Sequence, residues 1–208
     1  MKQFIFIIIA TLTFSVQAQT PYEKGMQKAL SLWKENKPTE AVNLFERISK
    51  AEPDNWLPPY YAAYVMITQG FNIKDVAQLK SGMDKALLFL NDAKSRSKNN
   101  PEIIILDALW HTVWVASDGQ KYGMLYGAKV AQMYEKALLL DPENPNVILN
   151  KAQWDMGGAK FFGKPVTAFC KDIEKAIELS KTFAPKALFY PKFDLKRAQQ
   201  LLEENCSN

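Results

Sequence analysis

The sequence offers few side chains that could carry out covalent chemistry. His111 is the only histidine, and it lies in the apolar stretch LWHTVW, so a nucleophile paired with a base would have to use this one imidazole. Neither cysteine forms a recognisable catalytic pair with it, and no His or Cys pair has the spacing of zinc ligands. We therefore expect His111 to be a packed helix residue, and we expect no enzyme activity, no metal site and no cofactor.

The two cysteines, Cys170 and Cys206, predict a disulfide rather than a reactive site. The N-terminal pattern described next indicates export to a compartment where disulfides form. If the last predicted helix folds back antiparallel on the helix before it, equal rise per residue places Cys206 next to about residue 168. A bridge would fix the C-terminal helix in place. The alternative is a buried free Cys170 and a frayed chain end at Cys206.

Residues 1–18, MKQFIFIIIATLTFSVQA, have the pattern of a secretory signal peptide. Lys2 gives a positive start, an apolar run follows, and residues 16–18 place small side chains at a cleavage site. The apolar run is too short to span a bilayer comfortably, although an uncleaved anchor is the alternative. We expect cleavage after Ala18, which leaves residues 19–208 as one soluble domain, periplasmic or secreted, without stable membrane insertion.

The charge pattern argues against a nucleic-acid partner. The chain has 26 Lys and Arg against 22 Asp and Glu, a net charge of +4, and removing Lys2 leaves 25 against 22, or +3. The densest basic cluster, KSRSK at 94–98, falls at a predicted helix end, where cations are favoured. No basic stripe interleaved with aromatic residues is present, so we expect no nucleic-acid binding.

The stretch GGAKFFGKP at 157–165 has the glycine content of a phosphate-binding loop. It lacks the Gly-Lys-Ser/Thr ending and a preceding strand, so a phosphate-binding loop is the weaker interpretation. We interpret it as a tight turn in which Gly163 leads into a helix that starts at Pro165.

Prolines and capping patterns divide the chain into helices. Asn100-Pro101 and Asn144-Pro145 are typical of an N-cap followed by the first helical residue. No segment after residue 20 shows a sustained alternating strand pattern. Helices are therefore predicted over about 21–36, 38–51, 56–70, 74–97, 101–117, 125–140, 145–158, 165–181 and 193–205. The stretch SDGQKYGMLYG at 117–127 is predicted to be an unusually apolar loop.

Two helix ends repeat the same spacing of residue types, with intervals of four, three and five residues. The two sets are Ala41, Phe45, Ile48 and Pro53, and Val130, Tyr134, Ala137 and Pro142. On a helix, the first three positions of each set lie along one stripe. The small residue lets a neighbouring helix approach, the aromatic residue fills the gap beyond it, and the proline ends the helix. A stack of helix pairs requires this arrangement.

This pattern resembles the second half of a tetratricopeptide repeat, whose motif has a small residue, an aromatic, a small residue and a proline at these spacings. GGAKFFGKP also resembles a loop of exported bacterial proteins of this type. The resemblance implies an all-α fold, namely an α-solenoid of about four helical hairpins plus a C-terminal capping helix. The hairpin between the two clear copies is irregular, with Leu79, Met83 and Ala86 at the four-and-three spacing. A helical bundle without repeats is the alternative.

In a solenoid of this type, the first helices of the hairpins form a concave face. Counting from Ala41 and Pro53 of the first motif, we expect this face to be lined by Met26, Leu30, Trp33, Leu57, Tyr60, Tyr64 and Ile67. Aromatic and methionine side chains suit an apolar or extended peptide. We therefore expect a scaffold that binds a protein or peptide in the bacterial cell envelope, with Tyr122 and Tyr126 of the predicted loop as further contacts.

Several alternatives remain open at this point. The aromatic residues could pack as core between hairpins, and Tyr122 and Tyr126 could fold back over their own hairpin. The chain could also be a structural subunit that stacks into an oligomer through its apolar ends. A third, weaker alternative is a small-molecule carrier or enzyme with a pocket between hairpins. The sequence does not set the oligomeric state.

Overall fold

The computed structural model describes residues 19–206, and within them the chain forms helices and no strand. The helices are α1 (Pro21–Lys34), α2 (Pro38–Ala51), α3 (Leu57–Gly70), α4 (Val76–Arg96), α5 (Pro101–Ser117), α6 (Gly119–Leu140), α7 (Pro145–Phe161), α8 (Cys170–Ser180) and α9 (Leu195–Cys206), with a short 3₁₀ helix η1 (Thr167–Phe169) before α8. The all-α prediction is confirmed. The predicted signal peptide, residues 1–18, lies outside the described residues.

Helix starts are set by the side chains that the sequence places before them. Thr20 forms a capping box with Glu23, in which the Thr20 hydroxyl accepts from the Glu23 amide at 3.1 Å. Asn100 caps α5 and Asn144 caps α7, each accepting from an amide two residues ahead. Because these oxygens satisfy amides that have no partner inside the helix, α1, α5 and α7 begin at their predicted positions.

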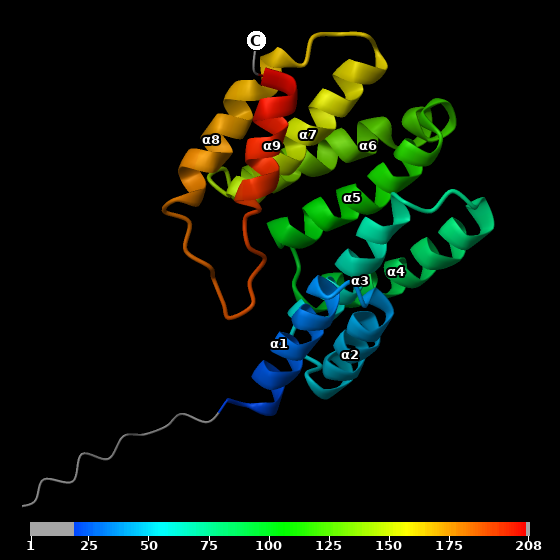
Figure 1. Ribbon diagram of the computed structural model, residues 1–208, viewed down its shortest axis with the longest axis vertical. Coiled ribbons are helices and arrows are strands. Elements are labelled where there is room, and N and C mark those ends of the chain that lie inside the picture. The colour runs from blue at the N-terminus through cyan, green and yellow to red at the C-terminus, as the bar shows by residue number, and fades with distance from the viewer. Residues whose placement is uncertain (1–18, 207–208) are drawn as a thin grey trace, which may run out of the picture.

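The helices pair into four hairpins that stack in chain order. These hairpins are α1/α2, α3/α4, α5/α6 and α7/α8, and α9 packs along α8 (Figure 1). The first helices also contact one another, α3 with α5 and α5 with α7. The described chain is therefore layered in sequence order as a solenoid, rather than gathered around one central axis.

The repeated spacing marks the seams of this stack. Phe45 is fully buried and stacks on Tyr61 with ring centroids 5.5 Å apart. Tyr134 is buried among α5, α6 and α7 with Ala108 and Val147. Each aromatic side chain fills the gap left by a small residue one turn earlier, which is the role that the spacing predicts.

Arg96 joins the first two hairpins. Its guanidinium group donates to the backbone carbonyls of Ser49, Glu52 and Asn55 at 3.2, 2.9 and 3.0 Å. It also pairs with Asp92 one turn earlier at 2.7 Å. These carbonyls lie at and just beyond the C-terminal end of α2, where the helix itself supplies no donor, so Arg96 gives this end of α2 its hydrogen-bond partners.

The prediction of a loop at 117–127 is wrong. Only Asp118 separates α5 from α6, and its carboxylate accepts from the Lys121 amide at 3.0 Å as the cap of α6. Glycines in a helix cost about 1 kcal/mol each, which made this stretch look like a break. The aromatic packing of Tyr122 and Tyr126 against α5 offsets that cost.

The turn after α7 follows the prediction, but the start of α8 does not. Gly163 has φ +63°, and the Lys164 amide donates to the Ala159 carbonyl at 2.8 Å, which closes a glycine-terminated helix end. The predicted helix start at Pro165 is wrong, because α8 begins at Cys170 after a 3₁₀ turn.

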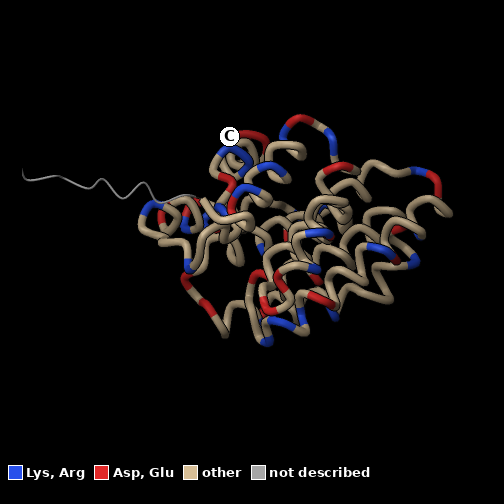
Figure 2. The backbone as a smooth tube through the Cα atoms, turned by 90° about the horizontal axis from the view of Figure 1, so that it is seen from below, with Lys and Arg blue, Asp and Glu red and all other residues tan. Residues whose placement is uncertain are grey.

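The charge distribution and the hydropathy of the helices are as follows. Lysine and arginine are interspersed with aspartate and glutamate over much of the tube in Figure 2. Within residues 19–206, no helix combines the length and the hydropathy needed to cross a bilayer.

Candidate functional site

The structure corrects the predicted concave lining. Met26, Leu57, Tyr60 and Ile67 belong to the buried core, with at most 4 % of their surface exposed. Leu57, Tyr60 and Ile67 are buried because α3 packs against α2, α4 and α5, and Met26 is buried where α1 packs against α2. Leu30, Trp33 and Tyr64 remain partly exposed, and the Trp33 and Tyr64 rings meet edge to face at 5.3 Å.

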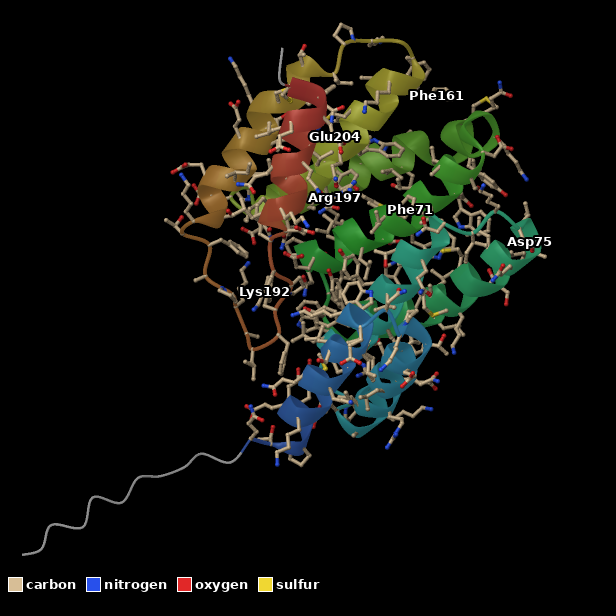
Figure 3. All side chains as sticks on the ribbon, viewed as in Figure 1. Phe71, Asp75, Phe161, Lys192, Arg197 and Glu204 are labelled. Carbon is tan, nitrogen blue, oxygen red and sulfur yellow. A yellow bond between two sulfur atoms is a disulfide. The ribbon has the colours of Figure 1, made fainter. Side chains whose placement is uncertain are left out.

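Residues 181–194, which connect α8 to α9, pack against aromatic side chains of α1 and α3 and against Trp56 just before α3, and we call them the strap. In Figure 1 the strap is the orange segment that runs from α8 toward α1 and returns to α9, and Figure 3 labels Lys192 on it. The Tyr61 hydroxyl donates to the Phe189 carbonyl at 2.8 Å, and the Phe189 ring meets Tyr22 edge to face at 5.8 Å. Tyr190 is buried next to Trp56. A segment of the chain itself therefore occupies the aromatic surface.

A buried polar cluster fixes the far side of the strap. Glu102 Oε1 accepts from Asn144 Nδ2 at 2.9 Å and from Asn146 Nδ2 at 3.1 Å. Asn146 Nδ2 also donates to the Pro191 carbonyl at 3.3 Å. Burial raises the pKa of Glu102 to about 6, and the two amide donors only partly offset this effect. In sequence, Glu102 looks like an ordinary acidic residue in a first helical turn, so its burial could not be foreseen.

Glu102 makes stability depend on pH. Because its pKa rises from 4.5 to about 6 on folding, the folded state binds the proton more tightly, and the stabilisation is lost as pH rises through this window. We expect Glu102→Gln, which cannot ionise, to escape that loss. In urea unfolding, the free energy of unfolding of the variant relative to the wild type should rise by about 2 kcal/mol between pH 4.5 and 7. Parallel pH profiles of the two proteins would contradict this prediction.

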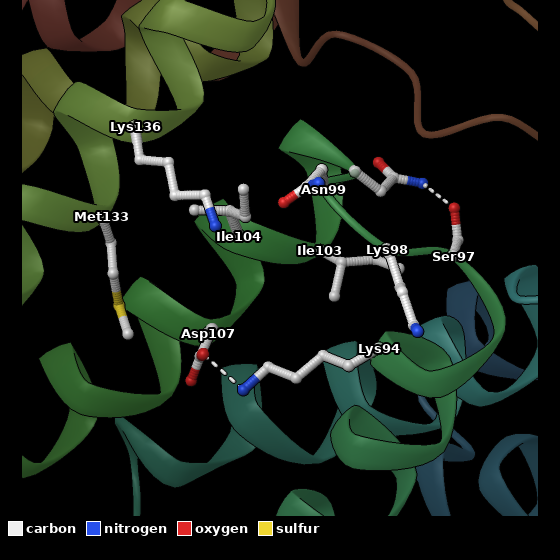
Figure 4. Close-up of a pocket in the computed structure, with 10 residues that line it drawn as sticks. Lys94, Ser97, Lys98, Asn99, Ile103, Ile104, Asp107, Met133 and Lys136 are labelled. Atoms are coloured by element: carbon white, nitrogen blue, oxygen red, sulfur yellow. Dashed lines mark hydrogen bonds and ion pairs between the residues drawn. The ribbon is translucent and has the colours of Figure 1, made fainter.

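A second surface feature is a hollow of about 440 Å³ between the end of α4, α5 and α6. We call it the basic hollow, and its lining residues are Lys94, Ser97, Lys98, Asn99, Asn100, Ile103, Ile104, Asp107, Met133 and Lys136. Figure 4 shows Ile103 and Ile104 at its centre, with Met133 and Lys136 on one wall and Lys94 and Lys98 on the other. The hollow therefore has an apolar floor and a basic rim.

The charges of the basic hollow are incompletely paired. Lys94 forms an ion pair with Asp107, which lies at the edge of the floor. Within residues 19–206, neither Lys98 nor Lys136 makes an ion pair. Two free ammonium groups beside an apolar floor suit a ligand that has both an apolar body and acidic groups. The sequence interpretation of 94–98 as a solvated helix end missed this site, because Met133 and Lys136 lie on a different hairpin.

The remaining chemical candidates are packed. His111 is buried, its Nδ1 lies 2.8 Å from the Asp107 carbonyl, and burial lowers the pKa of its imidazole. Tyr126 meets the His111 ring at 4.9 Å and stacks parallel to Tyr122 at 5.9 Å. Both tyrosines are partly buried and pack against the core. Among the described side chains, no group of three or more His, Cys, Asp and Glu could hold a metal ion.

The structure contains the predicted Cys170–Cys206 disulfide. It joins the first residue of α8 to the last residue of α9. Around it, Ile173, Ala176 and Ala198 form a separate core with residues of α7. The bridge therefore closes the capped end of the solenoid.

Comparison with known proteins gives a fold relative but no family. No family model matches the chain, and no curated protein matches it. Among solved structures, the HusA haemophore from Porphyromonas gingivalis is similar, with a TM-score of 0.78 and 22% sequence identity. The match covers 90% of this chain and 94% of that chain. At this level of identity the similarity shows a shared helical fold.

Proposed function

We propose that this protein is an exported, non-enzymatic carrier that binds a small, largely apolar molecule with acidic groups in the basic hollow. The observation that carries the proposal is the combination, in one hollow, of an apolar floor at Ile103 and Ile104 with Lys98 and Lys136 at the rim. Apolar contact provides affinity, and the ammonium groups orient the acidic end of the ligand.

The fold relative suggests which ligand to test first. HusA is described as a haemophore, and this chain shares its fold over nearly the full length. A porphyrin has a flat apolar ring system and two carboxylates, which matches the floor and the rim of the basic hollow. Export rests on the signal-peptide pattern of residues 1–18, and membership of the tetratricopeptide-repeat family, implied by the repeated spacing, is part of the same proposal.

The test is a titration with haem, protoporphyrin IX and the dimethyl ester of protoporphyrin IX, followed by tryptophan fluorescence and visible absorbance. Lys98→Glu/Lys136→Glu should weaken binding of both free acids at least about tenfold, because two favourable charge contacts become repulsive. Binding of the dimethyl ester, which has no free carboxylates, should change little.

The matched control is Lys28→Glu/Lys74→Glu, which makes the same change of charge at two exposed lysines far from the hollow in sequence. It should bind all three compounds as the wild type does. Equal weakening by both double variants would mean that overall charge, not the basic hollow, determines binding. Failure of the wild type to bind any of the three compounds would refute the carrier proposal.

A second candidate function is the peptide binding expected from the sequence. The observation that favours it is the strap, because Phe189 and Tyr190 already place a peptide segment against Tyr61 and Trp56. A partner peptide would take the place of the strap on this surface. A receptor of this kind would leave all three porphyrin titrations flat.

A further inference from the structure

An apolar patch lies where the start of α6 meets the end of α7. Its members are Met124, Leu125, Phe161 and Phe162, which are 88, 61, 59 and 72% exposed. The two phenylalanine rings meet edge to face at 5.1 Å. Exposed large apolar side chains at one end of a molecule indicate an interaction surface for a membrane or for another molecule.

The end of α7 contacts the helix that carries Met124 and Leu125. A Cβ atom added to Gly119 would lie only 2.9 Å from Cε2 of Phe161, so the Phe161 ring rests directly on the first turn of α6. Figure 3 labels Phe161 at this end of α7, beside the start of α6. The absence of a side chain at Gly119 allows this close approach. The exposed phenylalanines of α7 and the exposed apolar residues of α6 therefore lie on two helices that pack together at this end.

Lysines predominate in the sequence next to the patch residues, and the exposed Asp118 directly before α6 is the acidic residue nearest to Met124 in sequence. Residues 119–134 and 156–171 contain Lys121, Lys129, Lys160, Lys164 and Lys171 and no Asp or Glu. None of these lysines makes an ion pair within the described part of the chain.

We propose that this patch, which we call the lysine-ringed tip, docks the protein on an anionic lipid surface. Phe, Met and Leu side chains enter the boundary between headgroups and acyl chains, and lysines beside them reach the phosphates. Each lysine near an anionic surface adds to the attraction. A second copy of this chain fits poorly, because a symmetric contact would bring the same lysines of both copies together.

The proposal does not depend on what the basic hollow binds, because no residue of the lysine-ringed tip lines that hollow. It also adds no membrane-spanning segment. The docking is peripheral and reversible, which matches a patch of four apolar side chains.

The test is co-sedimentation of the protein, residues 19–208, with lipid vesicles. We expect binding to phosphatidylcholine vesicles that contain about 30% phosphatidylglycerol and much weaker binding to pure phosphatidylcholine. Met124→Ser/Phe162→Ser should lower the partition coefficient about tenfold, and Lys160→Gln/Lys164→Gln should lower it on anionic vesicles only. Circular dichroism and thermal unfolding should show that both variants remain folded.

The matched control is Leu88→Ser/Leu139→Ser, which removes two equally exposed apolar side chains (70 and 85% exposed) outside the tip. It should sediment as the wild type does. Absence of wild-type binding, equal binding to both vesicle types, or equal loss in the control would overturn the proposal. Sedimentation velocity without lipid adds one more outcome: a dimer abolished by Met124→Ser/Phe162→Ser would assign the tip to a second copy instead.

Discussion

Replacing Phe45 with alanine is expected to lower the free energy of unfolding by about 4 kcal/mol, the largest effect of any single substitution considered. Phe45 is fully buried, and its ring stacks on Tyr61. The variant loses the transfer free energy of the ring and leaves a cavity that the stacked hairpins cannot close without moving. Urea unfolding followed by circular dichroism measures this loss.

The substitution Phe45→Leu is the matched control. Leucine keeps much of the apolar volume, so the expected loss is about 1 to 2 kcal/mol. Tyr61 also holds the Phe189 carbonyl of the strap, so the alanine variant should in addition expose the strap to proteolysis before global unfolding. A loss below about 1 kcal/mol for Phe45→Ala would mean that the seam between α2 and α3 is not the tightly packed interface described above.

The second large effect is expected from the disulfide. Cys170→Ser/Cys206→Ser should destabilise the C-terminal end by about 3 to 4 kcal/mol, because the bridge closes a loop with a sequence separation of 36 residues. The helix α9 buries fully only Ala198, so its own packing is weak. Hydrogen exchange should therefore show that α9 loses protection first, while α1 to α5 keep theirs.

Reduction of the wild type provides the control for this prediction. A reductant should bring the wild type to the stability of the double serine variant, and it should leave that variant unchanged. Equal protection of α9 in the oxidised wild type and in the variant would mean that the small core around Ile173 and Ala176, not the bridge, holds the cap.

The helices and their stacking order could be predicted from local sequence signals. Asn100 and Asn144 before prolines mark helix starts, and the spacing around Phe45 and Tyr134 marks the seams between helices. These signals act within one or two helical turns, so they do not depend on distant parts of the chain. The pairing of Cys170 with Cys206 needed only the further step that two consecutive helices lie antiparallel.

The candidate sites were harder to predict, because exposure depends on what covers a residue. Tyr60 and Ile67 have the types and the register of a concave lining, yet neighbouring helices bury them. The basic hollow joins Lys98 to Lys136 across two hairpins. No local sequence pattern predicts that these two lysines lie in one hollow. The burial of Glu102 is equally non-local, because its hydrogen-bond partners lie 42 and 44 residues away.

The sequence by itself determined the helical class, the stacked hairpins, the proposed export signal and the disulfide partners, since each depends on spacing along one or two adjacent helices. The tertiary structure alone decided which surfaces remain open. It placed the strap over the aromatic face, extended α6 through three glycines, and left the basic hollow and the lysine-ringed tip uncovered. Burial is a property of the whole packed chain, so only the packed chain can assign it.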